Sequence, residues 1–255
     1  ARPFLRGREF FWQEGHTVHA TEKEAREETE NMLNVYKNFF EDYLAIPVLT
    51  GRKTEKEKFA GAEYTLTIES LMYNGVSLQS GTSHYFGQKF SKAYDIKFVT
   101  RDNTFDYAYQ TSWGVSNRMI GALIMVHGDD HGLVLPPKIA PLQVAIIKAT
   151  NDEETEKIAK DIQQKLKASN ISTFIDDTDK SFGYKLAEAE VNGIPVRIEL
   201  GKRDIQNNQL TISRRDTLEK EYISLDDDIV PYINSLMVKI QENLYQKAKE
   251  RRDSM

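Results

Sequence analysis

Residues 113–121 read Trp-Gly-Val-Ser-Asn-Arg-Met-Ile-Gly and join two kinds of predicted structure. We expect a strand over residues 107–113 that ends on Gly114, and a compact apolar helix over residues 114–127. Arg118 falls in the first turn of that helix, where a cation opposes the helix dipole. This position predicts that Arg118 serves an anion, with a surface ion pair as the alternative.

On both sides of this stretch, the sequence pattern in the first half of the chain predicts further antiparallel strands and one long helix. Apolar residues recur at helical spacing from Thr21 to Leu44, which predicts a helix over this range. Thr21 and Glu24 form a capping-box pattern at its start, and Pro47 ends the helical pattern. Residues 48–63 suit an exposed loop that a short strand enters. The other predicted strands cover residues 64–71 and 95–99.

The second half changes type after Pro136-Pro137, so we expect a domain boundary near Lys138. Strands and helices then alternate, which predicts an α/β domain around a mixed sheet. The expected strands are residues 144–149, 171–175, 194–200 and 209–213, and the expected helices are residues 153–168, 182–192 and 226–249.

The composition excludes several classes of protein. The chain has 255 residues, 34 Lys+Arg against 39 Asp+Glu, five His and no Cys. A disulfide framework, a thiolate nucleophile and a thiolate metal site are excluded, which suits a reducing compartment. No apolar run approaches the roughly 20 residues of a membrane span. The first residues resemble no signal peptide and include no initiator Met, so we expect a fragment of a longer protein.

Residues 12–16, Trp-Gln-Glu-Gly-His, form a first candidate site. On a strand, Trp12, Glu14 and His16 would project from one face, placing an apolar wall beside a carboxylate and an imidazole. Such a set suits a small cation with an apolar body, and a half-buried strand with solvated polar residues is the alternative. His16 and His19 would share a side only on a helix, so metal chemistry is a minor alternative.

Residues 79–84, Gln-Ser-Gly-Thr-Ser-His, form a second candidate. Their small residues would let backbone approach a ligand, while Gln79, Thr82 and His84 offer hydrogen bonds. Taken alone, the segment is more typical of a turn.

Several blocks in the same order resemble one family. Residues 2–137 resemble the C-terminal part of the catalytic domain of prolyl-tRNA synthetase, a class II aminoacyl-tRNA synthetase, in the archaeal and eukaryotic-like branch. Residues 138–243 resemble its anticodon-binding domain, and residues 244–255 would lead toward a further domain. The blocks are Arg2-Pro-Phe-Leu-Arg6, Trp12-Gln-Glu-Gly-His16, residues 53–61, Gly81-Thr-Ser-His84, Arg118-Met-Ile-Gly121, residues 125–129, 132–137 and 193–204.

The resemblance implies an α+β catalytic part, with the antiparallel sheet and helices of class II synthetases, followed by an α/β anticodon-binding domain with a mixed sheet. It implies that proline and ATP form prolyl-adenylate and that the prolyl group passes to tRNA(Pro). Catalytic roles fall on Arg6 and Arg118. ATP would contact Arg6, Gly7, Gln79, Thr82, Ser116 and Arg118, and proline would contact Trp12, Glu14, His16, Phe59 and His84.

The resemblance also implies Mg²⁺ with the phosphates, no metal held by the protein itself, a cytoplasmic homodimer and no membrane partner. Gly7 and Asn117 depart from the family pattern, where Thr at the first position and Thr or Ser at the second are common. A noncatalytic tRNA-binding or regulatory relative is the alternative function. For the anticodon we expect contacts from Lys185, Arg197, Glu199 and Arg203, with Arg214 and Arg215 nearby.

Overall fold

An antiparallel sheet organises the part of the chain around Arg118 in the computed structural model, which describes residues 3–255. Its strand order is β1-β7-β4-β3-β2. The strands are β1 (Trp12–His19), β2 (Val48–Arg52), β3 (Tyr64–Leu71), β4 (Ser77–Gly87) and β7 (Tyr109–Ser116). A separate hairpin pairs β5 (Lys97–Val99) with β6 (Phe105–Tyr107).

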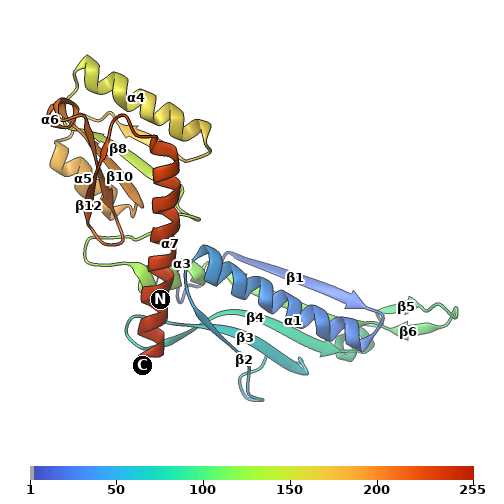
Figure 1. Ribbon diagram of the computed structural model, residues 1–255. Helices are drawn as coiled ribbons and strands as arrows, with labels where there is room; N and C mark the ends of the chain where they lie inside the picture. Colours follow the sequence, from blue (N-terminus) through green and yellow to red (C-terminus); the bar gives the residue numbers. More distant parts are fainter. Residues whose placement is uncertain (1–2) are drawn as a thin grey trace. The chain divides into compact units, whose positions relative to one another are not determined.

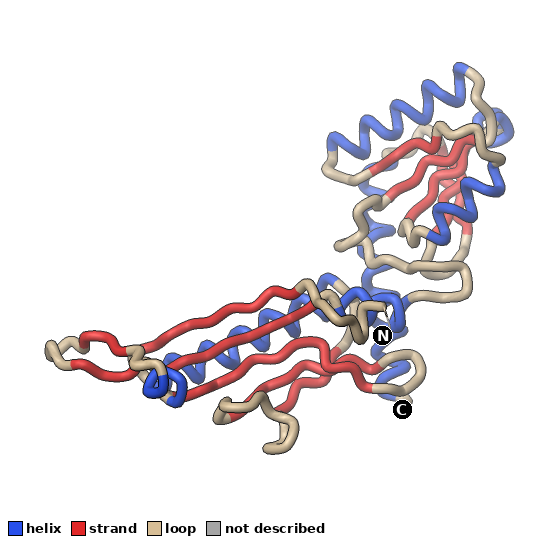
Figure 2. The backbone as a smooth tube through the Cα atoms, turned by 180° about the vertical axis from the view of Figure 1, so that it is seen from behind, coloured by secondary structure: helices blue, strands red, loops and turns tan. Residues whose placement is uncertain are grey.

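One face of this sheet is covered by α1 (Glu22–Asn38), which lies along the strands in Figure 1. The predicted capping box is confirmed, because the side chain of each of Thr21 and Glu24 bonds to the backbone of the other. On the sheet side, the Tyr36 hydroxyl donates to Gln13 at 2.6 Å, and the Ser83 hydroxyl donates to the Thr29 carbonyl at 2.7 Å. Among the described residues, no helix lies along the opposite face (Figure 2). That face holds the candidate site described below.

The outer strand β1 lies close to β7 because its backbone at Gly15 packs against the indole ring of Trp113. Gly15 of β1 pairs with Trp113 of β7, and a Cβ at Gly15 would lie 2.3 Å from the Trp113 ring. Only glycine leaves room for the indole at this position, so β1 can pair closely with β7.

Several predicted boundaries in this unit are corrected. The α-helix that was expected to run to Leu44 ends at Asn38. The chain then forms a π-helical turn, η1 (Phe39–Tyr43). The helix expected from Gly114 is α3 (Arg118–His127), because residues 114–116 still belong to β7. The turn expected at residues 79–84 is the middle of β4. A short helix, α2 (Lys89–Ala93), follows β4.

The second unit is an α/β layer around a mixed sheet, as predicted. The strand order in this sheet is β12-β11-β10-β8-β9. Strand β8 is parallel to β9 and β10, whereas β11 is antiparallel to both of its neighbours. The strands are β8 (Val144–Lys148), β9 (Thr173–Asp176), β10 (Val196–Leu200), β11 (Gln209–Arg214) and β12 (Lys220–Ser224), the last of which was not predicted.

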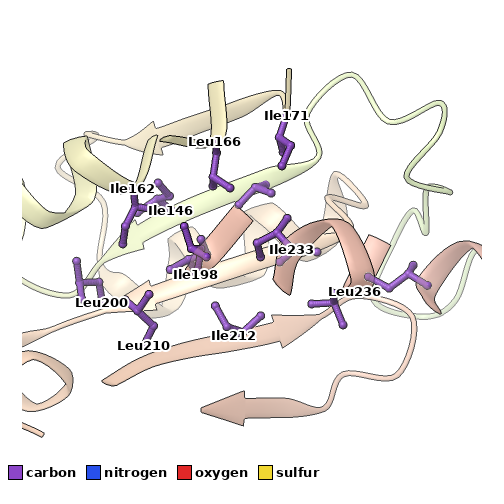
Figure 3. Close-up of a cluster of buried hydrophobic side chains, with 14 of the residues drawn as sticks. Ile146, Ile162, Leu166, Ile171, Ile198, Leu200, Leu210, Ile212, Ile233 and Leu236 are labelled. Carbon is purple, nitrogen blue, oxygen red and sulfur yellow. The ribbon is translucent and has the colours of Figure 1, made fainter. Parts of the chain in front are cut away.

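Alternation along β10 divides this unit into two packed layers. Ile198 and Leu200 face the larger core, shown in Figure 3, which also contains residues of α4 (Glu153–Ala168) and α7 (Ile229–Asp253). The other face is packed by α5 (Phe182–Val191), and a short helix, α6 (Lys202–Gln206), follows β10. Helix α7 continues to Asp253, so residues 244–253 are helical. That residues 244–255 lead toward a further domain stays a prediction.

By contacts, the first unit comprises residues up to Asp42, Ile46–Val126 and Arg251–Met255, and the second comprises Tyr43–Ala45 and His127–Glu250. Residues 127–137 therefore group with the second unit, and the domain division near residue 138 stays a prediction. Arg2, part of one quoted block, lies outside the described residues. No helix within residues 3–255 is both long enough and apolar enough to cross a membrane.

Candidate active site

A cavity of about 610 Å³ opens on the sheet face that α1 leaves free. Trp12, Glu14 and His16 of β1 line it together, which confirms that these alternate residues share one face of a strand. In register, they pair with Ser116, Gly114 and Ser112 of β7. His19 is an odd number of residues from His16 and projects from the other face of β1.

One wall of the cavity is aromatic. The Phe59 ring lies 5.0 Å from the His84 ring and 5.9 Å from the Phe86 ring, measured between centroids. Phe86 is buried, whereas Phe59 is 51% exposed. This wall offers an apolar surface to a small ring or aliphatic group.

Both nitrogens of His84 are hydrogen bonded within the sheet. Nδ1 lies 2.9 Å from the Thr65 hydroxyl, and Nε2 lies 3.0 Å from the Thr82 hydroxyl. Burial, together with the nearby His16, lowers the pKa of His84 to about 4. His84 is therefore neutral at physiological pH. Glu14 supplies a negative charge on this face and contacts His16 at 3.3 Å.

At another part of the cavity lies Arg118, the first residue of α3. Its backbone N–H donates to the Ser116 hydroxyl at 3.3 Å, and its guanidinium lies 5.7 Å from the Phe10 ring centroid. The Nε atom is buried and has no hydrogen-bond partner within the described residues. A buried, unpaired guanidinium N–H is costly, which favours an anionic ligand at this place.

The predicted nucleotide contacts are only partly brought together. Gln79, Thr82, Ser116 and Arg118 all line the cavity. Arg6 and Gly7 are exposed and are not among its lining residues.

Sequence reasoning missed several lining residues, among them Lys53, Thr65 and Gln110. Lys53 pairs with Glu69 at 3.0 Å, and a hydrogen bond from Ser77 together with Lys53 holds the pKa of Glu69 below its ordinary value. The Gln110 Oε1 atom is buried and has no partner within the described residues. The alternation of Thr65, Thr67 and Glu69 with apolar residues marked a polar strand face, but it did not single out any of them.

In the second unit, most predicted anticodon residues are buried and paired. Lys185 is 3% exposed and donates to the Asp176 carbonyl at 3.0 Å. Arg197 binds the Glu190 carboxylate, and Glu199 accepts from Ser213 and Lys220, each at 2.6 Å. Their charged groups thus have partners within the unit, although the Arg197 Nε atom is buried and has no hydrogen-bond partner within the described residues.

Arg214 and Arg215 are also paired, whereas Arg203 is exposed. Arg215 makes a two-bond ion pair with Asp129, and Arg214 makes one with Asp216. Arg203 on α6 is exposed and is the one predicted anticodon residue of the four whose side chain reaches solvent.

Comparison with known proteins matches both units. The description "tRNA synthetase class II core domain (G, H, P, S and T)" matches residues 1–127, and "Anticodon binding domain" matches residues 143–235. The chain is 52% identical over 252 residues to the proline–tRNA ligase of Mesoplasma florum and 55% identical over 254 residues to that of Ruminiclostridium cellulolyticum. The chain belongs to the prolyl-tRNA synthetase family.

A solved member of the same family has the same fold. The chain superposes on prolyl-tRNA synthetase from Cryptosporidium parvum, crystallised with L-proline and AMP, with a TM-score of 0.95 at 42% identity over 99% of its own length. It covers 55% of that synthetase chain, and 53% and 52% of the two ligases above. The chain thus spans about half the length of the relatives it matches, and its fold class is confirmed as class II core plus anticodon-binding domain.

Proposed function

We propose that the protein to which this chain belongs activates L-proline with ATP and transfers it to tRNA(Pro). The observation that carries this proposal is the cavity that combines an apolar wall and Glu14 with the buried, unpaired Nε of Arg118. Proline needs an apolar wall for its ring and an anion for its ammonium, and ATP needs cations for its phosphates.

In the proposed first step, a proline carboxylate oxygen attacks the α-phosphorus of ATP, and pyrophosphate leaves with the electron pair of the broken P–O bond. Trp12, Phe59 and His84 would enclose the proline ring, while Glu14 and His16 would face its ammonium group. A neutral His84 adds no positive charge beside that ammonium. Holding both reactants in one cavity removes much of the entropic barrier to the attack.

Arg118 would stabilise negative charge as it spreads over the phosphate oxygens. Gln79, Thr82 and Ser116 would hold the nucleotide around it, and Arg6 with the backbone of Gly7 would complete the ATP site. The exposure of Arg6 is compatible with a side chain that orders on ATP. Mg²⁺ would be held mainly by the phosphates, since no group of three or more His, Asp or Glu side chains within residues 3–255 is placed to hold a metal ion.

In the proposed second step, a 3′-terminal hydroxyl of the tRNA attacks the prolyl carbonyl carbon of prolyl-adenylate, the acyl–phosphate bond breaks and AMP leaves, while the second unit binds the anticodon. Among the four expected contacts, Arg203 has an exposed side chain suited to reading a base edge or a phosphate. Lys185, Arg197 and Glu199 would act by holding the sheet and α5 in place. The fit to an anticodon-binding domain over residues 143–235 supports this assignment.

We also propose three properties of the whole protein. It belongs to the archaeal and eukaryotic-like branch, which the likeness to the Cryptosporidium parvum enzyme supports. It acts as a homodimer, as the resemblance to class II synthetases implies, and it works in the cytoplasm, which the absence of cysteine supports.

Proline-dependent exchange of pyrophosphate into ATP by the full-length protein tests the central proposal. We expect exchange with proline to exceed exchange with alanine or cysteine, although a pocket of this kind excludes smaller apolar groups incompletely. Exchange at background level with every amino acid would favour a noncatalytic relative instead. The oligomeric state of the same preparation, from light scattering, tests the dimer.

A further inference from the structure

A continuous row of hydrogen-bonding groups crosses the candidate site. The Phe59 backbone N–H donates to the Thr65 hydroxyl oxygen at 3.0 Å, the Thr65 hydroxyl contacts His84 Nδ1 at 2.9 Å, and His84 Nε2 contacts the Thr82 hydroxyl at 3.0 Å. Thr65 is 2% exposed and pairs directly with His84 across β3 and β4. The row links a loop, two strands and the interior of the cavity.

The number of protons available fixes which group donates and which accepts in each hydrogen bond of this row. The Thr65 oxygen accepts the bond from Phe59, and a hydroxyl carries a single proton. Its one other partner in the described residues is His84 Nδ1, and a buried hydroxyl proton left unpaired is costly. Thr65 therefore donates to Nδ1, which must carry no proton. The ring proton of the neutral imidazole is then on Nε2, which donates to Thr82.

We propose that Thr65 is a positioning residue that fixes His84 as the Nε2–H tautomer and, through its bond to the Phe59 backbone, holds both walls of the pocket. Thr82, which accepts from His84, is left with its own hydroxyl proton free to donate into the cavity that it lines. The ligand atom opposite Thr82 is therefore a hydrogen-bond acceptor, such as a ribose oxygen or an adenine ring nitrogen of the nucleotide.

The tautomer follows from these contacts and from the cost of an unpaired buried hydroxyl proton. Assigning the pocket to proline rests on the function proposed above. Bonds in one direction along such a row polarise each other, which strengthens the last donor. Thr65 thus sets the hydrogen-bonding character of the cavity without touching the ligand through its hydroxyl.

Nitrogen NMR of the chain labelled with ¹⁵N-histidine tests the tautomer directly. Long-range proton–nitrogen correlations distinguish a protonated from an unprotonated ring nitrogen, and His84→Gln identifies the His84 signals by their loss. At neutral pH we expect the Nε2–H form in the wild type and in Thr65→Ser, which keeps the hydroxyl. Thr65→Val, of nearly the same shape, should show a mixed or inverted tautomer.

Thr67→Val is the matched control. Thr67 is also buried in β3, and its hydroxyl bonds the carbonyls of Ile68 and Gly81 rather than His84. Its replacement should leave the His84 tautomer unchanged. An Nδ1–H form in the wild type overturns the inference, as does an unchanged tautomer in Thr65→Val or a change in Thr67→Val as large as in Thr65→Val. The wild-type spectrum decides the tautomer even if Thr65→Val does not fold.

A kinetic readout separates this inference from the proposed function. In full-length protein, Thr65→Val should raise the KM for proline about tenfold or more while changing the KM for ATP less than about threefold, and Thr65→Ser should restore it. Equal effects on both KM values would contradict a role in placing the amino-acid walls. If the wild type shows no proline-dependent exchange, the proposed function fails, and the NMR result still decides the role of Thr65.

Discussion

Arg118 is the residue whose removal should matter most to the chemistry. Its Nε is buried without a hydrogen-bond partner within the described residues, which favours an anion at this place. Arg118→Ala in the full-length protein should slow proline-dependent pyrophosphate exchange by about 10²–10³-fold, or roughly 2.7–4 kcal/mol of transition-state stabilisation. Arg101→Ala, at an exposed arginine in the turn between β5 and β6, is the control. A loss below about tenfold would remove Arg118 from that role.

His84 should give the first unit a pH-dependent stability. Its pKa is about 4 in the folded chain against an ordinary value of 6.5, so between these values the unfolded chain binds more protons. This contribution to the free energy of unfolding is complete above pH 6.5 and falls as pH drops toward 4, by at most about 1.4 kcal/mol per pH unit. Urea denaturation at several pH values should show that slope in the wild type. If His84→Gln keeps the full slope, His84 is not its source.

Some site residues could be predicted from the sequence and others could not. Trp12, Glu14 and His16 alternate along one strand, so their common face followed from strand geometry alone. The role of Thr65 depends on a cross-strand pairing and on a loop N–H, and neither is visible in local spacing. Lys185, Arg197 and Glu199 looked like surface charges because the sequence does not show their partners, which come from other elements.

At the scale of elements, glycine explains the main errors of prediction. Gly81 lies inside β4, where a Cβ would approach the Tyr36 ring of α1 to 3.2 Å, so a small residue in the strand accommodates the helix. Gly114 lies inside β7, with the Trp12 ring 3.6 Å from where its Cβ would be. Both glycines are typical of turns when read locally. At Gly81 the close approach of α1 favours a residue without a Cβ, whereas a Cβ at Gly114 would make only an ordinary contact. Helix α4, whose amphipathic pattern and cap are local, was predicted to the residue.

Gly15→Ala tests the packing of β1 against β7. The new methyl group would lie 2.3 Å from the Trp113 ring, so the indole or the strand must move, at a cost of about 1–3 kcal/mol in stability. Gly51→Ala is the matched control, since Gly51 also lies in a strand and a Cβ there would meet nothing within 4 Å. Urea denaturation followed by tryptophan fluorescence measures both. Equal stability of the two variants would contradict the close approach.

At the scale of the whole molecule, the division into two units predicts that the two reaction steps can be separated. Arg203→Ala should weaken charging of tRNA(Pro) by about 1–3 kcal/mol while leaving pyrophosphate exchange unchanged, because Arg203 is exposed on the second unit and the cavity lies in the first. Full-length protein, assayed for both steps, provides the test. A variant that lost both steps equally would contradict the anticodon assignment.

Glu199→Ala should affect the same step for a different reason. It would remove a buried carboxylate that accepts from Ser213 and pairs with Arg197 and with the partly exposed Lys220. Because Arg197 keeps its ion pair with Glu190, the second unit should lose only about 1–3 kcal/mol of stability. Circular dichroism melting distinguishes this loss from the effect of Arg203→Ala, which should not change stability. Unaltered melting of Glu199→Ala would show that the carboxylate is dispensable to the fold.

The pairing of β1 with β7 also has a consequence during synthesis on the ribosome. Trp12 pairs with Ser116 and His19 with Tyr109, so roughly 100 residues must be added before β1 can pair with β7, its one neighbouring strand among residues 3–255. At about 5–20 residues per second, that interval is on the order of 5–20 s. Throughout it, the exposed aromatic residues Phe11 and Trp12 have no strand to join. The nascent chain therefore exposes an unpaired aromatic segment for many seconds. Chaperones that bind exposed aromatic segments would have this interval in which to bind it.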